Sequence, residues 1–459
     1  MDKGKEKKGE ASDPFNAWVA FMTERAQGIA CRPSQTQPCT IYRVPQNIRL
    51  SDADAYEPRI ISFGPYHRDE PRLQAMQKHK WEHLHAAFAR DPHGSLGDYI
   101  NEVRALEEQA RSCYSEDISL ESYEFVEMMV LDGCFIIELF VNVAANKTFE
   151  GGPIYSTKWM VPLIAQDMLR MENQIPFFVL ERLFQLFNRT SPRMPLVGLA
   201  LNFFDHIVPT NKSTQSPKAA HHLLHLLHAH LLPTPPDRNK PGKTRFQVSC
   251  ASSNWAASVF HRAKSSVPPR TIPSITEIRR AGIKFKKKRA AESFLDVTFE
   301  KGVIQMPTLT IYDSTTNTIF RNMIAFEQCC PRSGTYFTSY ATFMYCILET
   351  TKDATTLKQS RIVEHWLGSD EEVVRLFKGM CKGMAIDFDD NYLSGLIKHV
   401  AEVCETDWHT WRATLMRDYF SSPWSILQLE AAVLTFVFTL VQTTLAVLEY
   451  YHPRPGNNR

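Results

Sequence analysis

Two histidines and a glutamate lie close together with the types and spacing of a zinc site. His79, Glu82 and His83 match the pattern H-x-x-E-H in a segment that is predicted to be helical. Both imidazoles would then share one helix face and could bind zinc, while the carboxylate activates a water molecule. A metal-dependent hydrolase is therefore one hypothesis. A solvated helix face is the favoured interpretation, because residues 155–162, where a third ligand is expected, contain no carboxylate or histidine.

A run of basic residues is the most distinctive charged feature of the chain. Its members are Arg279, Arg280, Lys284, Lys286, Lys287, Lys288 and Arg289. On a domain held at a bilayer, such a patch would contact anionic headgroups, at about 1 kcal/mol per charge near the surface. The alternative is a solvated edge strand whose charges prevent aggregation.

A second cluster combines histidine with leucine. Its histidines are His221, His222, His225, His228 and His230. The spacing predicts a half-buried amphipathic helix over residues 220–232. Metal binding by the histidines is the alternative.

Composition and motif content exclude several classes of protein. The chain has 459 residues, 44% of them hydrophobic and 22% charged, which is typical of a folded protein. A net charge of +2 gives no reason to expect a nucleic-acid partner. The 10 cysteines include no CxxC pair, which favours reduced thiols over a disulfide scaffold. Without a GxSxG, P-loop or GxGxxG motif, we expect no cofactor and assign no catalytic residue.

The N-terminal extension, residues 1–38, is predicted to contain one short helix. Asp13 can cap this helix, and Pro14 suits its first position. Four apolar residues follow at helical spacing and form one stripe: Phe15, Trp18, Val19 and Met22. We expect the stripe to pack on the domain rather than on lipid, because no face rich in lysine and arginine accompanies it.

Residues 39–420 are predicted to form one large, mainly α-helical domain. Residues 39–67 have the proline and glycine spacing of extended segments. Apolar residues repeat at helical spacing over 73–90, 96–113, 121–143, 160–188, 195–208, 335–350, 369–381 and 391–420. Residues 209–270 are rich in serine, proline and lysine, which indicates a variable insertion.

One part of this domain, residues 284–326, has a β-rich pattern. Runs that favour strands occur at 283–288, 293–302, 303–314 and 318–326, with turn residues at 301–302 and 314–317. Just before it, Ser274 and Glu277 predict a capping box, and Gly282 can end that helix. The predicted fold class is therefore mainly α with a small antiparallel β-sheet, an α+β fold.

The segment 424–451 is predicted to be a single transmembrane helix. Residues 431–448 carry no charge, and with the flanking turns they cover a hydrocarbon core of about 30 Å. Trp424 lies at one end and Tyr450 and Tyr451 at the other, as aromatic residues do at membrane interfaces. A buried hairpin helix of a soluble core is the alternative.

Only a short tail, residues 452–459, follows this helix. The N-terminus has no apolar run long enough for a signal peptide. We therefore expect insertion after translation, with the large domain in the cytosol and the helix in the plasma membrane or the endoplasmic reticulum.

From about residue 39 to 452 the chain resembles the plant family built on domain of unknown function 247. The resemblance rests on blocks in the same order, among them CTIYRVPQNIR (39–49), AYEPRIISFGPYH (55–67), EFVEMMVLDGCFIIELF (124–140), MENQIPFFVLERLF (171–184), PSITEIRRAGIKFK (273–286) and RNMIAFEQC (321–329). It implies a plant origin, a mainly helical fold and an anchor near the C-terminus. It also implies recognition roles, since relatives are linked to self-incompatibility in grasses, but it supplies no catalytic residues. The family more usually has a non-ligand at the position of His83, which makes the zinc pattern accidental.

Three functional hypotheses follow. The first is a membrane-anchored interaction or recognition protein with an unknown protein partner. The alternatives are the metal-dependent hydrolase, and a peripheral domain that binds lipid headgroups through its basic residues.

Overall fold

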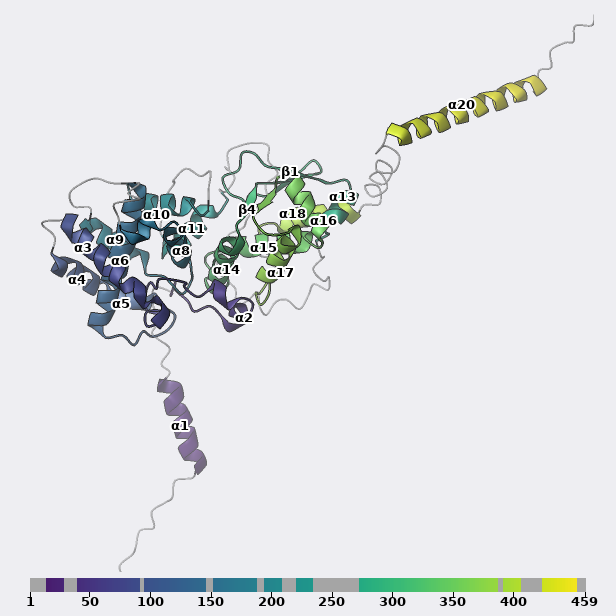
Figure 1. Ribbon diagram of the computed structural model, residues 1–459. Helices are drawn as coiled ribbons and strands as arrows, with labels where there is room; N and C mark the ends of the chain where they lie inside the picture. Colours follow the sequence, from purple (N-terminus) through teal and green to yellow (C-terminus); the bar gives the residue numbers. More distant parts are fainter. Residues whose placement is uncertain are drawn as a thin grey trace, which may run out of the picture.

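The computed structural model describes residues 14–28, 39–90, 95–145, 152–187, 194–208, 220–233, 272–386, 391–405 and 423–451. Asp13, most of the predicted insertion 209–270, residues 406–420 and the tail 452–459 lie outside these ranges. Figure 1 shows two neighbouring groups of helices, one from each half of the chain, with α1 and α20 extending away from them.

Helix α6 (Ser122–Ala144) is the central element of the N-terminal group. Its sequence is apolar on almost every face, so other helices must surround it. A capping box of Glu121 and Glu124 stabilises its first turn. The helices that pack against it are α3 (Gln77–Arg90), α4 (Leu96–Ala105), α5 (Glu107–Ser112), α9 (Phe177–Phe187) and α10 (Leu196–Asp205).

Shorter helices complete this group. They are α7 (Pro153–Ser156), α8 (Met160–Asp167), α11 (Leu223–Leu231) and the 3₁₀ helix η2 (Pro71–Met76). From the same half of the chain, α2 (Gln46–Arg49) and the 3₁₀ helix η1 (Ala53–Ala55) lie against the second group instead (Figure 1). The predicted helix 160–188 is divided into α8 and α9, with Pro176 immediately before α9. The predicted helices are otherwise confirmed in this half, whereas α2 and α7 were not predicted, because segments of four residues carry no periodicity.

The C-terminal group contains further helices: α13 (Ile275–Arg280), α14 (Asp313–Cys329), α15 (Tyr336–Ile347), α16 (Thr351–Gln359), α17 (Asp370–Met380) and α18 (Ser394–Glu405). The capping box of Ser274 and Glu277 is confirmed at the start of α13. Gly282 follows with a φ of 87°, the left-handed conformation that ends many helices.

The strands form two small sheets. In the first, β1 (Lys284–Lys287), β3 (Val303–Met306) and β2 (Thr298–Glu300) lie in that order, and the second pairs β4 (Leu309–Ile311) with β5 (Val363–His365). The antiparallel prediction is confirmed for the β2–β3 hairpin, which turns at the predicted residues 301–302. It is wrong for β1–β3 and β4–β5, which are parallel, because those partners are not neighbours along the chain.

Helix α14 corrects the end of the predicted β-rich segment 284–326. The predicted turn at 314–317 and strand at 318–326 both lie in this helix. Bonds between residues four apart support it, such as Arg321 Nε donating to Asn317 Oδ1 at 2.9 Å. The apolar residues here are buried on every side, so their periodicity could not distinguish strand from helix.

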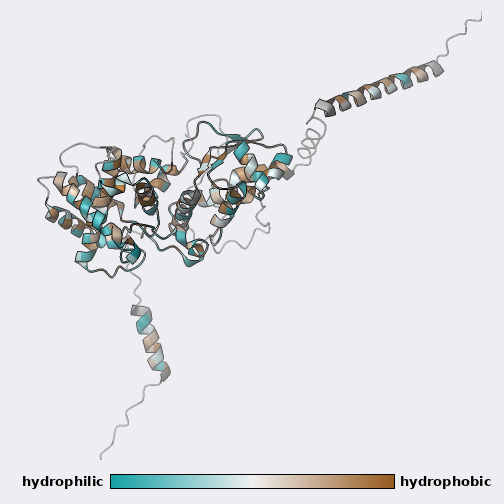
Figure 2. Cartoon of the chain, viewed as in Figure 1, coloured by the Kyte–Doolittle hydropathy of each residue, from teal (hydrophilic) through white to brown (hydrophobic). Residues whose placement is uncertain are grey.

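The two terminal helices stand apart from the domain (Figure 1). Helix α1 (Pro14–Gly28) forms as predicted, but the predicted packing of its stripe is wrong, since Phe15 and Trp18 are 62% and 57% exposed. An amphipathic pattern shows that a face prefers apolar surroundings without identifying the surface that provides them. Helix α20 (Pro423–Tyr451) carries apolar residues along its exposed length, as Figure 2 shows.

One continuous cluster of buried apolar side chains includes residues from both groups of helices. The N-terminal segment 39–67 connects the groups. Ile41 forms a β-bridge with Tyr114 in the first group, and η1 contacts α14 in the second. This segment is therefore one of the connections between the two groups, beside the contacts that α8 and α11 make with α14.

Candidate functional site

The H-x-x-E-H residues lie on α3 but do not form a ligand set. His79 Nδ1 contacts Glu82 Oε2 at 2.8 Å on the surface. His83 is buried, with Nδ1 2.7 Å from the carbonyl of His79 and Nε2 3.0 Å from the hydroxyl of Tyr155. Both nitrogens of His83 are thus engaged, and its ring packs 4.6 Å from that of Phe135. Among the described residues, no group of three or more His, Cys, Asp or Glu side chains could hold a metal.

The neighbouring residue Lys80, which is not part of the H-x-x-E-H ligand pattern, forms a buried ion pair. Its ammonium group is buried, 2.5 Å from Asp132 Oδ1 on α6, and donates to the carbonyl of Ser62 at 2.7 Å. The other carboxylate oxygen accepts from the Gly64 amide at 2.8 Å. Gly64 has a φ of 71°, and a Cβ there would lie 2.5 Å from the carbonyl oxygen of Gln174, so only glycine fits. The Lys80–Asp132 ion pair therefore holds α3 and the segment 62–64 against α6.

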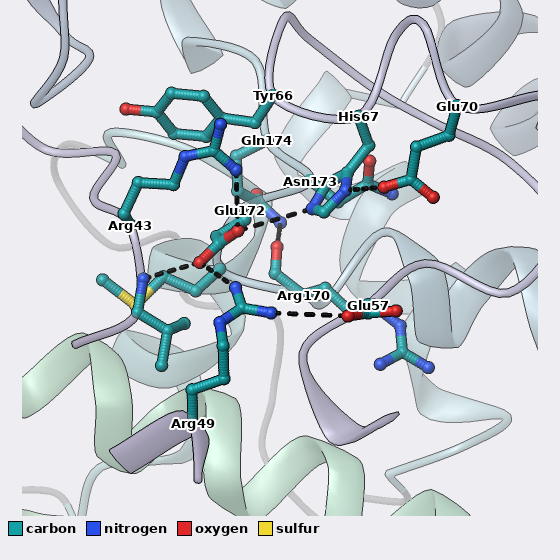
Figure 3. Close-up of polar contacts among 12 residues, drawn as sticks. Arg43, Arg49, Glu57, Tyr66, His67, Glu70, Arg170, Glu172, Asn173 and Gln174 are labelled. Atoms are coloured by element: carbon teal, nitrogen blue, oxygen red, sulfur yellow. Dashed lines mark hydrogen bonds and ion pairs between the residues drawn. The ribbon is translucent and has the colours of Figure 1, made fainter. Parts of the chain in front are cut away.

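Glu172 is the centre of a second buried network, which Figure 3 shows. Its carboxylate accepts from the Val44 amide at 2.7 Å, from Arg43 at 3.1 Å and from Arg49, and lies 3.5 Å from His67 Nε2. Burial raises the pKa of Glu172, but the hydrogen bonds from His67, Val44 and Arg49 outweigh this effect and lower the pKa to about 2. Glu172 is therefore a permanent anion that fixes residues 43–49.

Asn173 and Gln174 continue this network along the chain. Asn173 Oδ1 accepts from the Phe63 amide at 2.7 Å, and its Nδ2 donates to the Ile61 carbonyl at 3.0 Å. Gln174 Oε1 accepts from the Leu224 amide at 3.2 Å, which connects α11. Side chains of this kind replace backbone pairing where the extended segment has no neighbouring strand.

Asp167 and Arg170 hold the middle of the same segment. Asp167 accepts from the backbone amides of residues 59–61 at 2.8–3.1 Å and pairs with Arg170 Nε at 3.0 Å. Arg170 also donates to the carbonyls of residues 54 and 55. We call Asp167, Arg170, Glu172, Asn173 and Gln174 the polar hub. Most of its acceptors and donors bind the chain's own backbone, so the polar hub positions the N-terminal segment.

Sequence patterns alone predict no role for the polar hub or for the Lys80–Asp132 pair. A signal was present, because Glu172, Asn173 and Gln174 interrupt an apolar run between Met171 and Ile175. Consecutive polar residues in a buried segment must find partners. What the pattern could not supply was the identity of those partners, which are more than 100 residues away for Glu172.

The histidine tract forms α11 and the turn before it. Its side chains are more buried than expected for the predicted half-buried helix. His222 Nε2 lies 3.1 Å from the carbonyl of Thr40, and His228 Nε2 lies 2.8 Å from Glu327 Oε1. Glu327 also accepts from the Phe337 amide at 2.8 Å, at the start of α15. The tract thus connects both groups of helices through side chains.

Burial in this tract keeps two imidazoles neutral. It lowers the pKa of His222 well below its usual value and, together with the nearby His221 and His228, lowers the pKa of His225 to about 4. The rings of His225 and Phe326 lie 5.3 Å apart. Protonation of these histidines therefore opposes the folded state.

We expect the free energy of unfolding to fall as the pH decreases from about 6.5 to about 4, because the unfolded chain binds protons that the folded His225 excludes. The depressed pKa corresponds to about 3 kcal/mol, and partial exposure of the ring reduces this to about 2 kcal/mol. A His225→Phe variant should lose that share of the pH dependence. Urea titrations at several pH values measure it, with the exposed His206→Phe as control. Identical pH profiles for wild type and His225→Phe would contradict the assignment.

The basic run is distributed over three consecutive elements. Arg279 and Arg280 lie in the last turn of α13, and Lys284, Lys286 and Lys287 lie on β1 with exposed side chains. Lys288 forms an ion pair with Asp296 at 2.6 Å, whereas Arg289 is exposed. Most of the positive charge is thus exposed to solvent, on α13, on β1 and just after β1.

Comparison with known proteins identifies relatives of the chain. A family model described as a plant protein of unknown function, DUF247, matches residues 41–438. The chain belongs to this family. UPF0481 protein At3g47200 of Arabidopsis thaliana is 32% identical over 437 residues, which cover 92% of this chain and 89% of the relative. Putative UPF0481 protein At3g02645, also of Arabidopsis thaliana, is 24% identical over 480 residues, with 88% and 89% covered. No solved structure matches the chain significantly.

The polar hub explains how several DUF247 blocks fit together. The blocks at 39–49, 55–67 and 171–184 are distant in sequence, and the contacts of Glu172 and Asn173 join all three. The block at 321–329 contributes Asn322, whose Oδ1 accepts from the Met171 amide at 2.9 Å. The residues that carry the resemblance to DUF247 proteins thus include those that hold this fold together.

Within the described residues of this DUF247 chain, one helix is long and apolar enough to cross a membrane. It is α20, in which none of the residues in the apolar stretch Glu430–Val447 is buried. Trp424, Tyr450 and Tyr451 fall within the helix, but their side chains lie outside the described part. The helix is continuous for 29 residues, which is longer than the predicted apolar core requires.

Proposed function

We propose that this chain is a single-pass membrane protein whose helical domain acts as a recognition module, held at the bilayer by α20. The observation that carries the proposal is the complete exposure of an apolar helix of this length. A soluble protein would bury such a surface, because apolar patches of this size are rarely left in water. The lipid bilayer is thus the first partner that we propose, and a protein is the second.

The domain supports recognition rather than catalysis. Its most buried charged groups, the polar hub and the Lys80–Asp132 pair, bind the backbone of the chain and hold a rigid scaffold. We place this domain in the cytosol, because the described cysteines are free thiols, as is usual in a reducing compartment. A metal-dependent hydrolase is less well supported, since both ring nitrogens of His83 are already engaged. Nδ1 lies 2.7 Å from the His79 carbonyl and Nε2 lies 3.0 Å from the Tyr155 hydroxyl.

Truncation before Trp424 should convert the protein from membrane-bound to soluble. We expect the full chain to remain in the membrane pellet after alkaline carbonate extraction, whereas residues 1–423 are released. Arginines at Val437 and Thr439 should also release the chain, because each charge at the centre of a bilayer costs about 2.5–3.5 kcal/mol on insertion scales. Proximity labelling from the same two chains measures recognition, with membrane-adjacent protein neighbours expected only for the full chain.

The matched control places the same two arginines on the exposed face of α17, at Glu371 and Lys378, where extraction should be unchanged. Release of the full-length wild-type chain by carbonate would refute the anchor. Identical sets of labelled neighbours for the full and truncated chains would refute recognition at the membrane.

A further inference from the structure

A cavity of about 290 Å³ lies where the two groups of helices meet. One wall comes from Ile207 and Val208, which follow α10, and from Leu231 at the end of α11. The opposite wall comes from β4, α14 and α15. Small-molecule sites occur preferentially at such junctions and occupy about 300–1,000 Å³, so this cavity is at the small end of the range.

The floor of the cavity is aromatic. Phe294, Phe320 and Phe337 line it, and their ring centroids lie 5.5 to 5.8 Å apart. Phe320 and Phe337 are buried in the core, whereas Phe294 is half-buried. Such a surface is suited to an apolar chain or ring, because aromatic faces offer large contact area in fixed positions.

The rim of the cavity is basic. Lys287, Lys288 and Arg289 line it together with one acidic residue, Glu292. Asp296 neutralises Lys288 through the ion pair at 2.6 Å. Lys287 and Arg289 form no ion pair with any described residue. The charges of Lys287 and Arg289 suit a carboxylate, because each of its two oxygens can accept from one of these side chains.

We propose that this cavity binds a free amphipathic carboxylate with one short or medium apolar chain. The chain would lie against Phe294 and Phe320, and the carboxylate would pair with Lys287 and Arg289 at the rim. The small volume excludes the body of a lipid with two acyl chains. The inference depends only on the domain and is independent of the anchor.

The test uses the full chain in phosphatidylcholine nanodiscs and a decanoate that carries a photoreactive diazirine on its chain. Mass spectrometry should find the label on peptides covering residues 287–294 and 307–320, with label on α20 as the reference for probe dissolved in the bilayer. Excess decanoate should remove the domain label. Decan-1-ol should compete at least about tenfold more weakly, because it lacks the charge that pairs with the rim.

Variants distinguish the rim from general attraction by charge. We expect Lys287→Gln/Arg289→Gln to reduce the domain label about tenfold. Lys284→Gln/Lys286→Gln removes the same charge from residues of the same strand that do not line the cavity, and should leave the label unchanged. Ala291→Phe, which fills the opening, should abolish it.

Three results would overturn the proposal. The first is equal competition by decan-1-ol and decanoate. The second is equal labelling of the two glutamine double variants. The third is loss of the domain label when phosphatidylserine is added to the discs but not when decanoate is added, which would assign the cavity to a membrane lipid.

Discussion

Replacing Glu172 by glutamine should lower the free energy of unfolding by about 3 kcal/mol. The carboxylate has an unperturbed pKa of 4.5 and a folded pKa of about 2, and each pKa unit corresponds to about 1.4 kcal/mol. The variant keeps an acceptor for the Val44 amide but removes the counter-charge of Arg43 and Arg49. Breaking a buried ion pair on one side is costly, because the remaining charges lose their compensation.

The pH dependence of this effect has a definite sign. A carboxylate whose folded pKa is lowered contributes stability above its unfolded pKa and loses it as the pH falls through its folded pKa. The difference between wild type and Glu172→Gln should therefore be constant above about pH 5 and shrink between about pH 4.5 and 2.

Urea denaturation of the full chain in a mild detergent, followed by tryptophan fluorescence, measures this difference. Glu371→Gln is the matched control, because Glu371 pairs with Arg375 on the surface, where both side chains are about 70% exposed. Exposed pairs contribute about 0–1 kcal/mol. A loss for Glu172→Gln no greater than that of the control would show that the polar hub does not stabilise the fold.

Sequence patterns were sufficient to predict elements whose structure depends on residues close together in the chain. Helix α6 follows from an apolar run of its length, and α13 from the capping box at Ser274 with Gly282 at its end. The β2–β3 hairpin follows from the turn at 301–302, because a tight turn fixes the register of the strands it joins. These features depend on residues within a few positions of each other.

Sequence patterns did not predict the structure where the partner of an element is distant along the chain. The parallel pairing of β4 with β5 depends on a strand more than 50 residues away. Residues 318–326 of α14 match a strand pattern because they are buried on every side. The basic run was visible as charge, but the aromatic floor below it comes from α14 and α15 as well as from Phe294. A sequence shows which groups need partners, whereas the fold determines which partners they find.

The Lys80–Asp132 pair illustrates that difference and provides the largest expected effect. Both side chains are no more than 2% exposed. The H-x-x-E-H pattern around Lys80 instead predicts a role for His79, Glu82 and His83. Burial raises the pKa of Asp132 even though Lys80 and the Gly64 amide oppose the shift. An ionised Asp132 without Lys80 would thus be poorly compensated.

Lys80→Met should lower the free energy of unfolding by about 3–5 kcal/mol, because it leaves that carboxylate in the core and removes the donor to the Ser62 carbonyl. The double variant Lys80→Met/Asp132→Leu should recover part of the loss. It removes the uncompensated carboxylate, but the Ser62 carbonyl and the Gly64 amide still lose the partners that the pair provides. Urea denaturation of wild type, both single variants and the double variant gives the coupling energy. Lys78→Met, on the same helix with a side chain 81% exposed, is the control and should change stability by less than about 0.5 kcal/mol. If Lys80→Met were as mild as this control, Lys80 and Asp132 would not form a buried pair, and α3 would have to be held to α6 by apolar contacts alone.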